Sequence, residues 1–127
     1  MDSINIFGVK IHNTTLDETT KLAGEFLKGE SLKVIYTPNT EIVMAAKDDM
    51  ELKELLNRGD LIIPDGIGLI YGSRIQKKPL KERVTGFDTS IKLLEVANKN
   101  NYSLYLLGGK YGIAEAAAKN IKDKYHN

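Results

Sequence analysis

The sequence places a single carboxylate where an apolar segment gives way to glycine. Residues 61–63 are apolar, Pro64 follows them, and Asp65 precedes Gly66 and Gly68. A short apolar run is typical of a buried parallel strand, and ligands of open α/β sheets bind beyond the carboxyl ends of such strands. Glycine lets the backbone approach a ligand closely. The pattern indicates a functional carboxylate at Asp65, although a turn or N-cap aspartate explains it equally well.

A second polar cluster surrounds Pro38. The run 32–37 is rich in strand-forming residues, and the proline ends it. Asn39 or Thr40 is a typical N-cap for the helical pattern that follows. Thr37 and Asn39 offer a hydroxyl and an amide beside the helix start, and capping does not explain both. Neighbouring parallel strands end at the same edge of a sheet. We therefore expect Thr37, Asn39 and Asp65 to line one pocket.

The glycine pair Gly108-Gly109 is a candidate phosphate-binding loop. It lies between a predicted strand over 102–107 and a predicted helix over 113–125. Free backbone N–H groups and a helix dipole at such a junction can hold a diphosphate. The spacing matches neither the dinucleotide fingerprint nor a Walker motif, and a tight turn without ligand is the more frequent meaning of such glycines.

The segment 74–83 is basic, with five cationic side chains and one acidic side chain. Such a run is usually a solvated connector. It follows the Asp65 segment closely, so its arginines can fold over a phosphate. Arg83 is the best candidate because a guanidinium binds phosphate oxygens in a bidentate fork. We expect the lysines at 77, 78 and 81 to meet anionic lipid headgroups or water.

Composition narrows the classes of partner. Eighteen basic and seventeen acidic residues give a net charge of +1, which argues against nucleic acid. The absence of cysteine excludes disulfides and thiolate metal sites and suits the cytoplasm. No Asp-X-Asp pair is present, so we predict neither a metal nor another cofactor. His12 and His126 fall in no motif and are expected to be structural or exposed. No apolar run is long enough for a membrane span.

The elements that must position these residues alternate between strand and helix patterns. Strand-to-helix units in series imply an α/β fold, with a Rossmann-like, mostly parallel sheet and helices on both faces. We expect one domain over residues 1–127, incomplete at its carboxyl end because a helix is the last element. The expected elements are a strand or hairpin in 4–12, a helix from Thr14 or Thr15 to Gly29, the strand 32–37, a helix from Thr40 that restarts near Asp48 and ends at Gly59, the Leu61 strand, a glycine-laced segment to Gly72, a helix containing Phe87, the strand 102–107 and a helix over 113–125.

Four motifs resemble, in order and spacing, those of the WecG/TagA/CpsF glycosyltransferase family. Each motif is ordinary alone, but the set is specific and covers nearly the whole chain. Family members continue past the last residue of this sequence, with further strands and helices and a basic carboxyl-terminal appendage used at the membrane. The motifs are Thr37-Pro38-Asn39, Pro64-Asp65-Gly66-Ile67-Gly68, Glu82-Arg83-Val84-Thr85-Gly86, and Leu107-Gly108-Gly109 followed by Gly112-Ile113-Ala114-Glu115.

The resemblance implies a specific reaction. Family members similar to this sequence transfer N-acetylmannosamine from UDP-N-acetylmannosamine to N-acetylglucosamine on undecaprenyl diphosphate. They invert the anomeric carbon without a required metal, in the synthesis of the wall teichoic acid linkage unit. The resemblance also implies a cytoplasmic enzyme, peripheral at the inner face of the plasma membrane. The alternatives are a family member with another UDP-sugar donor and a nucleotide-sugar binding module without turnover.

The resemblance also implies roles for the candidate residues. Asp65 matches the position of the catalytic base, and Arg83 matches that of a phosphate partner. Thr37 and Asn39 then orient sugar hydroxyls or the acceptor. The Gly108-Gly109 loop carries the nucleotide diphosphate, and Gly66 and Gly68 are further substrate-binding residues. An open sheet edge and uncovered apolar faces also lead us to expect a homo-oligomer.

Overall fold

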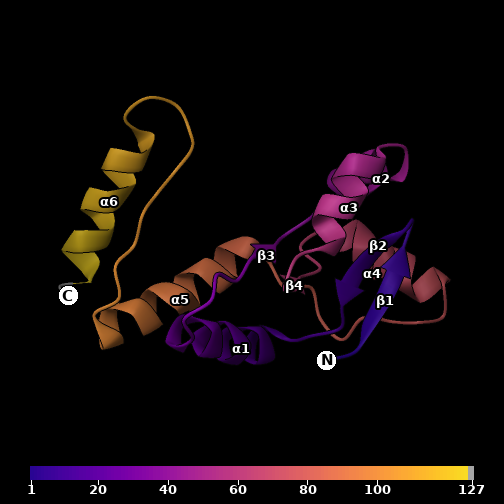
Figure 1. Cartoon of the computed structure of the whole chain (residues 1–127), viewed down its shortest axis with the longest axis horizontal. Helices are drawn as coiled ribbons and strands as arrows, with labels where there is room; N and C mark the ends of the chain where they lie inside the picture. Colours follow the sequence, from indigo (N-terminus) through magenta and orange to yellow (C-terminus); the bar gives the residue numbers. More distant parts are fainter. Residues whose placement is uncertain (126–127) are drawn as a thin grey trace. The chain divides into compact units, whose positions relative to one another are not determined.

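The computed structural model describes residues 1–125, so the expectation for His126 lies outside the described residues. The chain divides into two compact units, Met1–Ser90 and a second that begins at Ile91. Six helices and two small sheets make up the described fold, which confirms the mixed α/β class (Figure 1).

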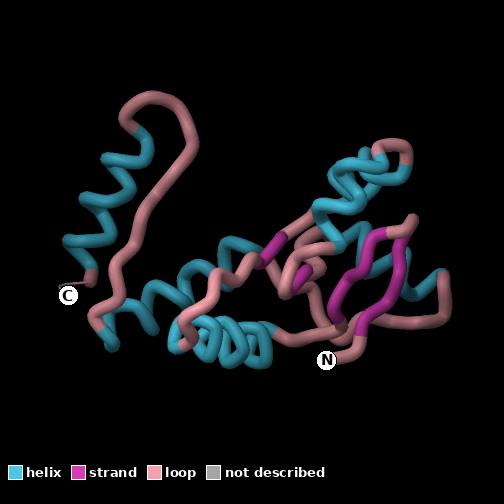
Figure 2. The backbone as a smooth tube through the Cα atoms, viewed as in Figure 1, coloured by secondary structure: helices cyan, strands magenta, loops and turns pink. Residues whose placement is uncertain are grey.

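The first unit opens with a β-hairpin. Strands β1 (Ser3–Ile6) and β2 (Val9–His12) pair antiparallel, as the alternating pattern around Gly8 predicts (Figure 2). The two turn residues, Phe7 and Gly8, both have positive φ, at 50° and 89°. A right-handed strand twist favours this turn geometry, and glycine adopts it without steric cost.

Helix α1 (Leu16–Lys28) begins and ends where the sequence predicts. The Thr15 hydroxyl accepts a hydrogen bond from the Glu18 amide at 3.1 Å, which satisfies a free donor of the first turn. Gly29 is the C-cap. The helix buries Thr19 and Ala23 and leaves charged residues exposed, so local capping and amphipathic spacing together define it.

A parallel pair of short strands leads to the candidate site. Strand β3 (Ile35–Tyr36) lies beside β4 (Leu61–Ile62), with Ile35 opposite Leu61. The strand expected over 32–37 is shorter in the structure. One reason is that the amide of Val34 donates to the Asp60 carboxylate at 2.8 Å instead of to a strand. This two-stranded pair is the described parallel sheet.

Helices α2 and α3 follow β3 in the chain, and helices α4 and α5 follow β4. The predicted restart near Asp48 is confirmed, one residue later: Asp48 is the C-cap of α2, and the Asp49 carboxylate caps the next helix by accepting from Leu52 N at 3.1 Å. The bounds are α2 (Thr40–Lys47), α3 (Met50–Asn57), α4 (Ile67–Ile75) and α5 (Gly86–Asn100).

Two apolar clusters hold the first unit together. The smaller one contains Leu61, Ile63 and Val84, which connects β4 to the segment before α5. The larger one joins the hairpin, α2, α3, α4 and β4. Its buried members are Ile6, Val9, Ile11, Val43, Ala46, Leu56, Ile62, Leu69, Ile70 and Leu80. Burial on this scale anchors both ends of the Asp65 segment.

The second unit contains the end of α5, an extended segment and helix α6 (Ile113–Lys124), which matches the predicted helix. The predicted strand over 102–107 is wrong, because these residues form an extended chain that pairs with no strand of the described residues. A strand requires hydrogen bonds to a neighbouring strand, and the described residues supply none to this segment.

Candidate active site

The Asp65 carboxylate lies just beyond β4 and is held from one side. Its own amide donates to the carbonyl of Ile63 at 3.0 Å, which forms a tight turn. Oxygen Oδ2 accepts a hydrogen bond from the Gly86 amide, at 3.3 Å, at the start of α5. No other residue in the described part of the chain donates to the side chain. One oxygen is therefore oriented by the protein, and Oδ1 remains available to a substrate.

Arg83 lies beside Asp65, as the sequence predicts. Its Nε donates to the Asp65 backbone carbonyl at 2.7 Å, and the neighbouring Val84 amide donates to the carbonyl of Pro64 at 3.1 Å. Two bonds thus connect the basic segment to the Asp65 turn. The terminal guanidinium nitrogens of this exposed side chain donate to no described residue, so they can still bind a phosphate.

The rest of the Glu82–Gly86 motif secures this arrangement. The Glu82 carboxylate accepts from the Leu16 amide at the start of α1, at 2.6 Å. The Thr85 hydroxyl accepts from the Asp88 amide at 2.9 Å and acts as a cap for α5. The sequence alone predicts neither role. The Thr85 cap had a local signal, an acid three residues after a threonine, but the partner of Glu82 is distant in sequence.

Thr37 and Asn39 lie around the same turn, so the structure brings them near Asp65. A Cβ added to Gly86 would lie 3.1 Å from Thr37 Cγ2, which places the threonine side chain against the glycine that binds Asp65. The expected capping role of Asn39 is confirmed, because its Oδ1 accepts from the Ile42 amide at 2.9 Å. Its side-chain nitrogen has no partner among residues 1–125.

Gly66 and Gly68 allow α4 to approach α2, and Thr40 is the residue that they contact. A Cβ on Gly66 would lie 2.9 Å from the Thr40 backbone nitrogen, and one on Gly68 would collide with the Thr40 hydroxyl. The sequence predicts Thr40 only as an alternative N-cap of the helix that follows Pro38. The structure instead makes it the neighbour of both glycines, an approach that any larger residue would prevent.

Three helices begin around this turn. The Gly86 amide of α5 bonds Asp65, the first turn of α4 follows Gly66, and Thr40 of α2 contacts both glycines. The N-cap residue of α4, Gly66, makes no side-chain cap bond, so α4 retains unsatisfied amide donors there. The positive ends of the helix dipoles make this region favourable for an anion.

His12 supports the strand that leads to Asp65, a role that the sequence did not reveal. Its Nδ1 accepts a hydrogen bond from the Ile62 amide at 2.9 Å, so the side chain joins the hairpin to β4. Burial lowers the pKa of this imidazole, and the charge of Lys10 lowers it further. Both effects favour the neutral form that the bond requires.

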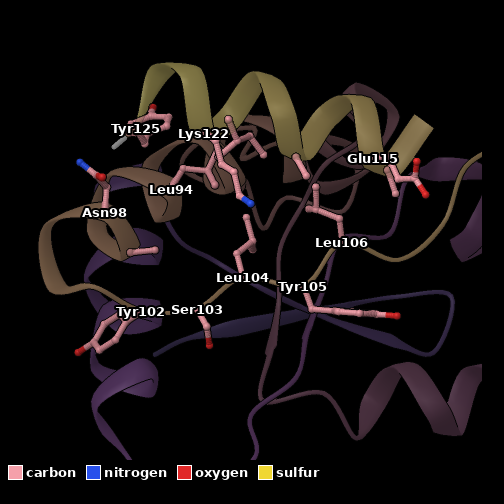
Figure 3. Close-up of a pocket in the computed structure, with 14 residues that line it drawn as sticks. Leu94, Asn98, Tyr102, Ser103, Leu104, Tyr105, Leu106, Glu115, Lys122 and Tyr125 are labelled. Atoms are coloured by element: carbon pink, nitrogen blue, oxygen red, sulfur yellow. The ribbon is translucent and has the colours of Figure 1, made fainter. Parts of the chain in front are cut away.

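Gly108 and Gly109 belong to the second unit, and their predicted proximity to Asp65 stays a prediction. Both are exposed and have positive φ, at 122° and 76°. The same unit contains a cavity of about 420 Å³ between α5, the segment 102–106 and α6. Leu104 and Leu106 point toward α6, whereas Tyr105 points away from it (Figure 3). None of the predicted site residues lines this largely apolar cavity.

The described residues contain no group of three or more His, Cys, Asp or Glu side chains placed to hold a metal ion. Within residues 1–125, no helix is both long enough and apolar enough to cross a membrane.

Comparison with known proteins confirms the family that the sequence resembles. Residues 4–127 match the model of the glycosyl transferase WecG/TagA/CpsF family. The chain belongs to this family. Curated relatives from Staphylococcus aureus strains NCTC 8325, COL and MSSA476 are each 30% identical to it over 126 residues. Each is named N-acetylglucosaminyldiphosphoundecaprenol N-acetyl-beta-D-mannosaminyltransferase. The alignment covers 98% of this chain, and the chain spans about half the length of these relatives (50%).

Proposed function

We propose that this WecG/TagA/CpsF family member is the part of an inverting glycosyltransferase that carries the catalytic base. The donor is UDP-N-acetylmannosamine, and the acceptor is N-acetylglucosamine on undecaprenyl diphosphate, as in wall teichoic acid linkage-unit synthesis. The observation that carries the proposal is the Asp65 carboxylate, held by Gly86 at one oxygen and beside Arg83. The names of the relatives support the acceptor and the transferred sugar.

In the proposed mechanism, Asp65 acts as the general base. Oδ1 takes the proton from the acceptor hydroxyl while that oxygen attacks the anomeric carbon of the donor. The bond from this carbon to the UDP oxygen breaks on the opposite face, and its electron pair leaves with UDP. One displacement inverts the carbon, so one carboxylate suffices. The Gly86 bond to Oδ2 orients Asp65 for this transfer.

The leaving diphosphate is stabilised by cationic and backbone donors. Arg83 uses Nε on the Asp65 carbonyl and has its terminal nitrogens free for phosphate oxygens. The amino end of α4 adds unsatisfied amides, and Gly66 and Gly68 let the ligand approach the backbone there. The Gly108-Gly109 loop completes the diphosphate site in this proposal. No metal or other cofactor takes part.

Thr37 and Asn39 orient the sugar or the acceptor. Both are exposed beside the Asp65 turn, and Asn39 has donor capacity left after capping α2. A hydroxyl and an amide at this position can each bond a sugar hydroxyl.

The working enzyme has a Rossmann-like, mostly parallel sheet with helices on both faces, and the parallel pair of β3 and β4 supports this assignment. The enzyme works at the cytoplasmic face of the plasma membrane, as a homo-oligomer.

The decisive experiment measures acceptor-dependent UDP release from UDP-N-acetylmannosamine with an N-acetylglucosaminyl diphospholipid. It compares this chain, the longest native form of the protein, Asp65→Asn in that form, and Asp17→Asn as a matched control on the exposed side of α1. Asp65→Asn should keep UDP affinity and lose about two to four orders of magnitude in turnover, the range for a positioned base.

Loss of UDP binding with normal turnover would contradict the role of Asp65. Release that depends on the acceptor but requires a different UDP-sugar would favour a family member with another donor. UDP binding without turnover in every form would favour a nucleotide-sugar binding module.

A further inference from the structure

The outer face of α4 presents apolar side chains that the described fold leaves uncovered. Ile67, Tyr71 and Ile75 are 48%, 56% and 82% exposed. Their spacing of four residues puts them on one side of the helix, and the opposite side buries the residues that join the core, namely Leu69, Ile70 and Ser73. With Arg74, these three residues are called the α4 face below.

Cationic side chains border the α4 face at its carboxyl end. Arg74 lies over the Tyr71 ring, with its guanidinium carbon 6.0 Å from the ring centre, and Lys77 and Lys78 follow in the next turn. None of these three cations pairs with an acid within the described residues. The sequence from 66 to 81 contains no acidic residue at all. The carboxyl-terminal border of the α4 face therefore carries positive charge without a compensating acid from this segment.

The cations are held on an ordered turn. The Lys77 and Lys78 amides donate to the carbonyls of Arg74 and Ser73, both at 3.0 Å, which closes a Schellman motif. Lys77 occupies the left-handed position with φ of 60°, where glycine is usual. The buried Leu80 then ties the segment back, because its amide donates to the Ser73 hydroxyl at 3.1 Å.

The charge pattern selects the partner. Isolated exposed apolar residues are ordinary, but here apolar, aromatic and cationic groups adjoin on one rigid element. A second copy pairing through the same face would bring like charges together around a two-fold axis. An anionic lipid surface instead matches both features, since the apolar side chains enter the headgroup region and the cations meet phosphates. Lys81 is excluded from this surface because it pairs with Glu18 at 3.2 Å.

We propose that the α4 face and Lys77-Lys78 bind an anionic lipid surface. The inference rests on the proposed function in one respect: a lipid-linked acceptor then reaches Asp65, which lies two residues before the first apolar member, Ile67. A helix of nine residues is about 13 Å long, so lipid contact along α4 keeps the reacting end near the headgroups.

The test is co-sedimentation of the 127-residue chain with vesicles of phosphatidylcholine containing phosphatidylglycerol, and with pure phosphatidylcholine. We expect binding to the anionic vesicles only, weakened by salt. Lys77→Gly should lower the partition coefficient about fivefold, as expected for one cation near an anionic surface. Because glycine suits the left-handed turn, this variant should fold at least as well as the wild type.

Ile75→Ser should lower the partition coefficient several-fold. The matched controls are Leu32→Ser, a loop residue that is 88% exposed, and Lys21→Gln on α1, and both should bind as the wild type does. Asp65→Asn should also bind normally, which separates this proposal from the catalytic one. Equal loss in the controls, or no binding by the wild type, would overturn it. So would light scattering that shows Ile75→Ser dissociating a dimer while vesicle binding is unchanged.

Discussion

The two units of the chain differ in how they treat their apolar side chains. The first unit has an apolar core whose members, from Ile6 to Val84, are at most 6% exposed. In the second, Tyr105 and Leu107 are 84% and 89% exposed, and α6 buries no residue. The candidate residues therefore differ in how firmly the fold positions them. Asp65 and Arg83 are attached to the buried core of the first unit. Gly108 lies in the second unit, where none of the described residues is buried.

The hydrogen bonds show the same difference. Side chains of the first unit bond to backbone groups that are distant in sequence, including Glu82 to Leu16 and His12 to Ile62. Outside the helices of residues 91–125, hydrogen bonds such as Tyr102 to Ala97 join residues that are close in sequence. The candidate site of the first unit is therefore held by long-range contacts, and these contacts break together when the unit unfolds.

The largest expected effect tests the buried core against the exposed segment. Ile63→Ala, at a site with 0% exposure, should lower the free energy of unfolding by about 2–5 kcal/mol, because it removes buried methyl groups and leaves a cavity. Leu107→Ala should change it by no more than about 0.5 kcal/mol. Urea denaturation measures both. Similar losses would mean that residues 102–107 are packed as tightly as β4.

An intermediate effect concerns the glycines of α4. Gly68→Ala should destabilise the protein by about 1–3 kcal/mol, because the new methyl group would collide with Thr40. Gly72→Ala, in the same helix with open space around it, should stabilise the protein by about 0.5–1 kcal/mol. Thermal unfolding compares the two variants, and Thr40→Ala should relieve part of the first loss. A neutral Gly68→Ala would show that α2 and α4 lie farther apart.

The smallest expected effect is a pH dependence that arises at His12. Its pKa is lowered from 6.5 in the folded protein, so the unfolded chain binds the proton first as the pH falls. The free energy of unfolding should therefore decrease below about pH 6.5 and level off below the folded pKa. His12→Asn keeps an acceptor for Ile62 without titrating. Denaturation from pH 7.5 to 5.5 should be flatter for this variant, and parallel curves would exclude the role.

Several parts of the fold were predictable because they depend on neighbours in the sequence. The turn at Gly8, the Thr15 cap of α1 and the Asn39 cap of α2 each follow from local conformational preference and a nearby hydrogen bond. The segment 102–107 was not predictable in this way. Its composition favours a strand, but a strand exists only where a partner supplies backbone hydrogen bonds.

The sequence by itself determined the boundaries of α1, α2 and α6, the mixed α/β class and the residue types of the candidate site, because capping, periodicity and motif spacing are local properties. Only the tertiary structure decided that Arg83 bonds the Asp65 carbonyl, that Gly86 orients its carboxylate and that Thr40 faces Gly66 and Gly68. These contacts join residues separated by 18 or more positions. Such pairs meet because burial of the core packs β4 against the segment before α5, and no local preference specifies that packing.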